Sequence, residues 1–217
     1  MKVKRMKRLC DRLAAFIARR SAREDDDIEV ISYGLQGILG TVMEFALIIL
    51  SGKILGMLKE TLVMSATFVT LRLMAGGVHF STYNRCLVSS VLIFVFGGFL
   101  VRLAVLLPGF VETLYLASAS LFAAYCIYRY SPRDNPNRLI REEELPRFRR
   151  ASLITTGLVL AAVWTDYAIK GGAAWYHHSL VTGLLLEGFT LTDCGYLLVK
   201  CIEKKLDRKG GVINEKS

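Results

Sequence analysis

Histidine and cysteine are scarce in this sequence, and the cysteines are not clustered. The 217 residues include three histidines and five cysteines, and the cysteines form no CxxC pair and share no regular spacing. Disulfide frameworks and zinc ribbons depend on such spacing, so the sequence argues against both, and we expect no metal site and no cofactor. It also lacks an internal repeat, a low-complexity linker and a nucleic-acid-binding signature. We therefore expect a single domain over residues 1–217 and no nucleic-acid partner.

Apolar residues, in contrast, are abundant and occur in long runs. They make up 53% of the chain, and the mean hydropathy is +0.41. Runs of about 20 apolar residues have the length needed to cross about 30 Å of hydrocarbon. The sequence therefore predicts an all-α membrane protein with six transmembrane helices in contact with the lipid bilayer. The predicted spans are 31–50, 54–74, 87–107, 109–129, 151–169 and 174–199.

The first thirty residues precede this six-span bundle of residues 31–199. Six of their apolar residues recur at helical spacing, with Lys and Arg on the opposite face. This pattern predicts an N-terminal amphipathic helix that lies on the cytoplasmic membrane surface and does not cross the bilayer. The six residues are Met6, Leu9, Cys10, Leu13, Phe16 and Ile17. Residues 200–217 are predicted to form a cytoplasmic tail.

Positive charge is distributed unevenly between the predicted spans. Of the 28 Lys and Arg residues, 24 lie in residues 1–30, 72–86, 129–150 and 200–217, which share one side of a six-span protein. Loops rich in Lys and Arg remain in the cytoplasm. We therefore expect a multi-pass protein of the cell membrane with both termini in the cytoplasm. This topology also accounts for most of the net charge of +9.

One polar stretch, RLMAGGVHFSTYNRC at residues 72–86, interrupts the apolar sequence. The glycines at 76–77 should break the second span, because glycine admits backbone angles that end a helix. His79 would then lie on the turn and Cys86 in the first turns of the next helix. A thiol at a helix N-terminus beside an imidazole ionises more readily and becomes a nucleophile for acyl transfer. The alternative interpretation is an interfacial histidine and an unreactive cysteine.

The spacing of Arg72, Gly77, His79 and Cys86 resembles the signature of the AgrB family, the membrane peptidases of Gram-positive quorum sensing. Two further stretches, YSPRDNPNRLI at 130–140 and LLLEGFTLT at 184–192, are similar to the family's central cytoplasmic loop and C-terminal span. The likeness extends over almost the whole chain, including its length and six-span layout.

This resemblance implies a cysteine endopeptidase of the bacterial cytoplasmic membrane whose active site faces the cytoplasm. The substrate would be an AgrD-type propeptide, cut at the C-terminal side of the segment that becomes a cyclic autoinducing peptide. Carried over by position, His79 and Cys86 are the catalytic pair, and Arg72 and Gly77 support the site. A thioester acyl-enzyme would then be captured by the peptide itself to give a thiolactone or a lactone. The resemblance is also compatible with a homodimer.

Other polar groups in the cytoplasmic half of the bundle are candidates to orient His79, as the third member of a catalytic triad does. These candidates are Gln36, Glu187 and Asp193. The competing interpretation is that they form hydrogen bonds between helices. For the whole protein, the alternative function is a small transporter or a non-catalytic peptide-binding membrane protein. A transporter of this kind should show paired repeats with broken helices at the bilayer midplane, and the sequence has no repeat.

Overall fold

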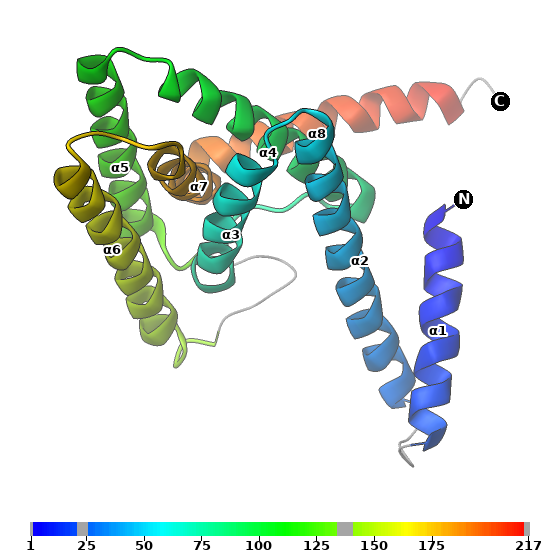
Figure 1. Ribbon diagram of the computed structural model, residues 1–217. Coiled ribbons are helices and arrows are strands. Elements are labelled where there is room, and N and C mark those ends of the chain that lie inside the picture. The colour runs from blue at the N-terminus through cyan, green and yellow to red at the C-terminus, as the bar shows by residue number, and fades with distance from the viewer. Residues whose placement is uncertain (1, 21–25, 134–140, 215–217) are drawn as a thin grey trace. The chain divides into compact units, whose positions relative to one another are not determined.

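The computed structural model describes residues 2–20, 26–133 and 141–214, and the side chains of residues 8–19, 28–133 and 141–208. Most of the predicted central loop, residues 134–140, lies outside these ranges. The described residues form eight helices (Figure 1). They are α1 (Lys2–Arg20), α2 (Asp26–Ile54), α3 (Leu58–Ala75), α4 (Tyr83–Val105), α5 (Gly109–Tyr130), α6 (Leu145–Lys170), α7 (Trp175–Leu191) and α8 (Asp193–Asn214).

Four of these helices are long and apolar enough to cross a membrane. Their candidate spans are Ile28–Ile54, Tyr83–Val105, Gly109–Tyr130 and Leu145–Lys170. The other two predicted spans correspond to α3 and α7, which have 18 and 17 residues. Charged residues interrupt α3, and α7 is too short. The all-helical fold is confirmed, and the count of six spans stays a prediction.

The last predicted span, 174–199, ends earlier than expected. Helix α7 stops at Leu191, because Thr192 has an extended backbone with φ −74° and ψ 157°. The Thr192 hydroxyl accepts a hydrogen bond from the Gly195 N–H at 3.1 Å, and α8 begins at Asp193. Threonine followed by an acidic residue is a common helix start. The apolar character of the surrounding sequence hides this signal.

The described chain divides into two compact units, residues 1–47 and 48–217, with the boundary inside α2. In the first unit the Ser32 hydroxyl donates to Asp11 Oδ1 at 2.6 Å. On α1, Leu13 and Phe16 of the apolar face are exposed. The location of α1 on a membrane surface and the single-domain organisation of the whole chain stay predictions.

Helix α7 is the centre of the second unit, where it contacts α3, α4, α5, α6 and α8. Its Leu184 and Leu191 are fully buried and cluster with Leu71 of α3 and Ile127 of α5. Helix α3 approaches closely because Gly183 has no side chain. The core of this unit therefore surrounds the shortest and least exposed of its helices.

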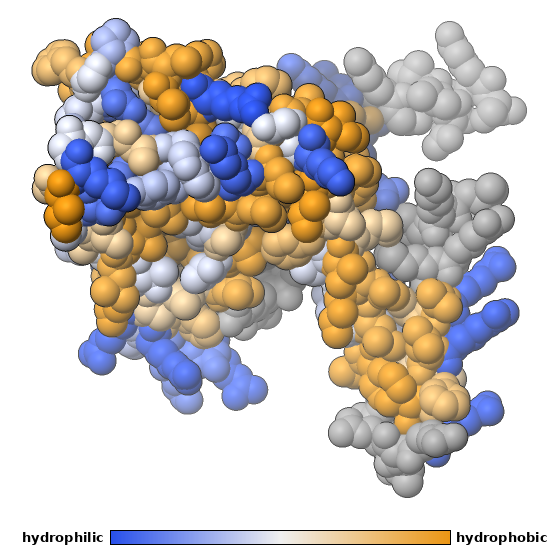
Figure 2. All heavy atoms as spheres, viewed as in Figure 1, coloured by the Kyte–Doolittle hydropathy of each residue, from blue (hydrophilic) through white to orange (hydrophobic). Residues whose placement is uncertain are grey.

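The outward faces of the longer helices are apolar. Large hydrophobic side chains on α4, α5 and α6 remain exposed, and Figure 2 shows apolar residues over much of the visible surface. Examples are Leu92, Phe96, Leu103, Leu121, Ile154 and Leu158. Soluble monomers rarely expose such extensive apolar surface, so these faces are suited to contact with lipid.

The close packing of α7 against α3 leads to a prediction about the free energy of unfolding. A Cβ at Gly183 would lie 2.6 Å from the Met64 carbonyl oxygen, so Gly183→Ala should destabilise the protein by about 1–3 kcal/mol. Gly157 of α6 is the matched control, since a Cβ there meets no atom within 4 Å. Thermal unfolding in detergent should show a lower midpoint for Gly183→Ala than for Gly157→Ala. Equal midpoints would contradict the central position of α7.

Candidate functional site

The candidate site is built on the 76–86 segment, which ends α3 and begins α4. Helix α3 stops at Ala75, and Gly76 and Gly77 have φ angles of +79° and +113°. Two backbone hydrogen bonds hold the turn: the Gly77 N–H donates to the Arg133 carbonyl, and the Val78 N–H donates to the Thr190 carbonyl, each at 3.3 Å. The predicted glycine break is confirmed.

His79 and Cys86 come together across this turn. Helix α4 begins at Tyr83, so Cys86 lies in its first turn. The Cys86 Sγ lies 3.7 Å from the His79 Nδ1, a hydrogen-bonding distance for sulfur. His79 is exposed and Cys86 is half-buried. The two residues that the motif singled out therefore lie next to each other and remain accessible from outside the fold.

The surroundings of His79 favour a neutral ring. Partial desolvation by neighbouring protein atoms, and then the positive charge of Arg72, lower the pKa of the His79 imidazole to about 4. At neutral pH the ring is therefore unprotonated. Because Nδ1 faces the sulfur, the tautomer with its hydrogen on Nε2 is able to accept the thiol proton.

Arg72, near the end of α3, connects the 76–86 segment to α7. Its Nη2 donates to the Val78 carbonyl, and its Nη1 donates to Thr190 Oγ1 at 2.7 Å and to Glu187 Oε2 at 3.4 Å. The Glu187 side chain is fully buried, and Arg72 is the charged group that contacts it. Arg72 therefore connects Glu187 to the 76–86 segment.

Close contacts with neighbouring atoms also require glycine at both positions of the turn. A Cβ at Gly77 would overlap the Arg72 guanidinium and lie 2.8 Å from Thr190 Oγ1. A Cβ at Gly76 would overlap the carbonyl oxygen of Arg133. Neither position has room for a side chain, in addition to the positive φ angle that favours glycine at each.

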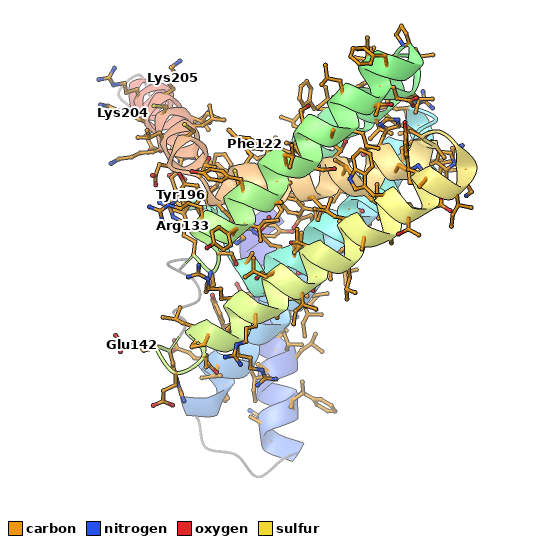
Figure 3. All side chains as sticks on the ribbon, turned by 90° about the vertical axis from the view of Figure 1, so that its left-hand side faces the viewer. Phe122, Arg133, Glu142, Tyr196, Lys204 and Lys205 are labelled. Atoms are coloured by element: carbon orange, nitrogen blue, oxygen red, sulfur yellow. The ribbon has the colours of Figure 1, made fainter. Side chains whose placement is uncertain are left out.

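Arg133, in the segment after α5, joins several parts of the site and was not predicted from the sequence. Its N–H donates to the Ala75 carbonyl at 2.8 Å, and its Nη1 donates to the Leu191 carbonyl at 2.6 Å. Its Nη2 pairs with Asp193 Oδ1 at 2.7 Å. The guanidinium also lies 3.9 Å from the centroid of the Tyr196 ring (Figure 3). Its partners are distant in sequence, so no local pattern marks this arginine.

The three candidates to orient His79 have other partners in the described structure. Glu187 contacts Arg72, Asp193 pairs with Arg133, and Gln36 of the first unit donates to Ser32 Oγ at 3.2 Å. The contacts of Glu187 and Asp193 link different parts of the chain, whereas the Gln36 contact lies within α2. A direct role for any of the three toward His79 stays a prediction.

Helix α8 lies against the 76–86 segment. The Ser81 N–H donates to Glu203 Oε1 at 2.6 Å, and Arg85 pairs with Asp207. Glu203 and Asp207 are one helical turn apart and so share a face of α8. The sequence predicted only a tail over residues 200–217. The tail is instead helical through Asn214 and contacts the 76–86 segment.

Within the described ranges, no group of three or more His, Cys, Asp or Glu side chains is arranged to hold a metal ion. The chemistry that the site offers with its own residues is a thiol, a neutral imidazole beside it, and an arginine that fixes the backbone between them.

Comparisons with known proteins find related sequences over most of the chain. An AgrB-like protein of Clostridium perfringens strain 13 is 22% identical over 183 residues, which cover 81% of this chain and 86% of that protein. An AgrB-like protein of Halalkalibacterium halodurans is 25% identical over 215 residues, covering 98% of this chain and 99% of the relative. One from Listeria monocytogenes serovar 1/2a is 26% identical over 195 residues, with coverage of 88% and 91%.

A family model supports the same relationship. The model described as "AgrB: Accessory gene regulator B" matches residues 10–191, which include the entire 76–86 segment and α7. No solved structure matches the chain. The chain therefore belongs to the accessory gene regulator B family, and this membership supports a role in processing an accessory gene regulator peptide of the AgrD type.

Proposed function

We propose that the protein is a membrane cysteine endopeptidase that cleaves an AgrD-type propeptide, with Cys86 as nucleophile and His79 as general base. The observation that carries this proposal is the 3.7 Å separation of Cys86 Sγ and His79 Nδ1 on an accessible turn. A nucleophile next to a base within hydrogen-bonding reach is the geometry that covalent acyl transfer requires. Family membership supplies the substrate class.

In the first step the Cys86 thiol attacks the carbonyl carbon of the peptide bond while its proton passes to His79 Nδ1. The tetrahedral intermediate collapses with cleavage of the C–N bond. His79 returns the proton to the departing amine, and the N-terminal part of the propeptide remains bound to Cys86 as a thioester. The His79 ring is neutral before the attack, so its Nδ1 is free to accept the thiol proton.

In the second step a Cys or Ser side chain within the bound peptide attacks the thioester carbonyl. The C–S bond breaks, the Cys86 sulfur is reprotonated, and the peptide leaves as a thiolactone or a lactone. Ring closure competes with water, so holding the peptide nucleophile close to the thioester supplies much of the selectivity.

Arg72, Gly77 and Glu187 serve as positioning residues in this proposal. Arg72 binds the carbonyl of Val78, the residue immediately before His79, and is itself bound by Thr190 and Glu187. Gly77 leaves the space that the guanidinium occupies. The three residues fix the turn and thereby set the approach of the imidazole to the sulfur.

The proposal includes six membrane spans, with the termini and the 76–86 segment on the cytoplasmic side. It is supported by the uneven distribution of Lys and Arg and by the apolar surfaces of the longer helices. In it, α1 lies on the membrane surface, and the homodimer suggested by family resemblance is retained as part of the proposal.

Removing the nucleophile or the base tests the mechanism. Purified, reconstituted Cys86→Ala should show no cleavage of an AgrD-type propeptide while still binding it, and His79→Ala should lose at least about 100-fold in rate. Cys194→Ala is the control, because Cys194 is exposed on α8 and lies outside the pair. Mass spectrometry of the wild-type reaction should find the peptide linked to Cys86. Full cleavage by Cys86→Ala would end the peptidase proposal and favour a binding or transport function.

The glycine contacts give a second test of the site. Gly77→Ala should displace Arg72 and reduce propeptide cleavage at least about tenfold with little loss of folded protein. Gly171→Ala is matched to it, since Gly171 also has a positive φ of +69° but its Cβ would meet no atom within 4 Å. Similar activities of the two variants would show that the space Gly77 leaves for Arg72 is not needed for cleavage.

Topology is tested by thiol labelling of cysteines introduced at exposed turns of a cysteine-free protein. Glu142→Cys, before α6, should react with a membrane-impermeant maleimide only after the cells are permeabilised. Gly172→Cys, in the turn between α6 and α7, should react in intact cells, because α6 separates the two positions. Labelling of residue 142 from outside the cell would contradict the proposed orientation.

A further inference from the structure

Helix α8 has an apolar face that no described residue covers. Its members recur at helical spacing, and all are exposed. We name this face the α8 stripe, which consists of Cys194, Leu197, Leu198, Cys201, Ile202 and Leu206. Basic residues accompany it: Lys200, Lys204, Lys205 and Arg208 are also exposed. Lys205 lies within the stripe, where its long side chain is able to bury its methylene groups and extend its charge to the polar boundary.

The acidic face of α8 is already occupied. Glu203 accepts the hydrogen bond from the Ser81 N–H, and Asp207 pairs with Arg85. On a helical projection these two residues lie on the side of α8 opposite the centre of the stripe. Helix α8 thus presents carboxylates to the 76–86 segment and presents apolar and basic side chains to its surroundings.

We propose that the α8 stripe docks on the anionic lipid surface of the membrane, so that α8 is held between the bilayer on one face and the 76–86 segment on the other. Two observations favour lipid as the occupant. The four exposed basic residues complement acidic headgroups, and α8 continues directly from α7 within a unit whose longer helices already expose lipid-compatible surfaces. An amphipathic helix with these two components binds at the headgroup boundary.

Figure 1 and Figure 3 show how the fold permits this arrangement. Helix α8 turns away from α7 at Thr192 and runs at a steep angle to α5, and Lys204 and Lys205 lie far from Phe122 of α5. A helix in this orientation lies along the end of the helical bundle. Lipid docking of α8 would therefore restrain Ser81 and Arg85, which lie between His79 and Cys86 in the chain.

The depth of α8 in the bilayer, measured on the full chain, tests the docking without relying on catalysis. A protein with Cys86→Ala and the other cysteines replaced, except Cys201, carries a spin label at residue 201 and is reconstituted in phosphatidylcholine vesicles with or without phosphatidylglycerol. Collision rates with oxygen and with a water-soluble nickel chelate report the depth of the label. With phosphatidylglycerol present, the label at 201 should be accessible to oxygen and protected from nickel, whereas a label at Lys204→Cys should remain accessible to nickel.

A variant that lacks the basic charges of α8 tests the contribution of the anionic headgroups. Replacing Lys200, Lys204 and Lys205 by Gln should lower the ratio of docked to undocked α8 about fivefold per lysine in vesicles with phosphatidylglycerol and should leave it nearly unchanged in phosphatidylcholine alone. Equal nickel access at residues 201 and 204 in anionic vesicles would overturn the proposal. Protection of residue 201 from both probes, with spin–spin broadening between molecules, would also overturn it by assigning the stripe to a second copy. Because the labelled protein lacks Cys86, either result is independent of the peptidase proposal.

Discussion

The site depends on the contacts of the Arg72 guanidinium, because these are side-chain contacts that join the turn to the core. The guanidinium binds the Val78 carbonyl on one side and the side chains of Thr190 and Glu187 on the other. Glu187 is fully buried, so its carboxyl group has no water to bond and depends on partners within the protein. The same contact therefore stabilises α7 and sets the position of the backbone beside His79.

This arrangement couples the geometry of the candidate site to the packing of the core. Helix α7 is held by α3 and α5 through close contacts at Gly183 and Gly188, and its C-terminal end supplies both Thr190 and Glu187. A displacement of α7 in the core would move the anchor of Arg72 and, through it, the imidazole. Arg133 restrains the same end of α7 by its bond to the Leu191 carbonyl, so the turn is fixed from two directions.

The sequence predicted the parts of this site that are local. Paired glycines end α3, and the short spacing to the next helix brings His79 to Cys86, because both effects follow from residues within one turn and one helix start. The α7–α8 break was missed because Thr192 lies in an apolar run whose hydropathy outweighs one N-cap signal. Arg133 was missed for a different reason: its contacts with Ala75, Leu191 and Tyr196 depend on tertiary packing, which a single sequence does not encode in any nearby pattern.

The two glycines of the turn differ in the kind of atom that a Cβ would meet, and this difference determines whether a second substitution could relieve the overlap. At Gly77 the nearest atoms belong to the side chains of Arg72 and Thr190, so a second substitution that shortens one of them is able to make room for a methyl group. At Gly76 the nearest atoms are the backbone of Arg133, which every amino acid at position 133 carries. A shorter side chain at position 72 or 190 would therefore relieve the overlap at Gly77, although the strain of its φ of +113° would remain. A substitution at Gly76 has no side-chain remedy and requires the two chain segments to separate.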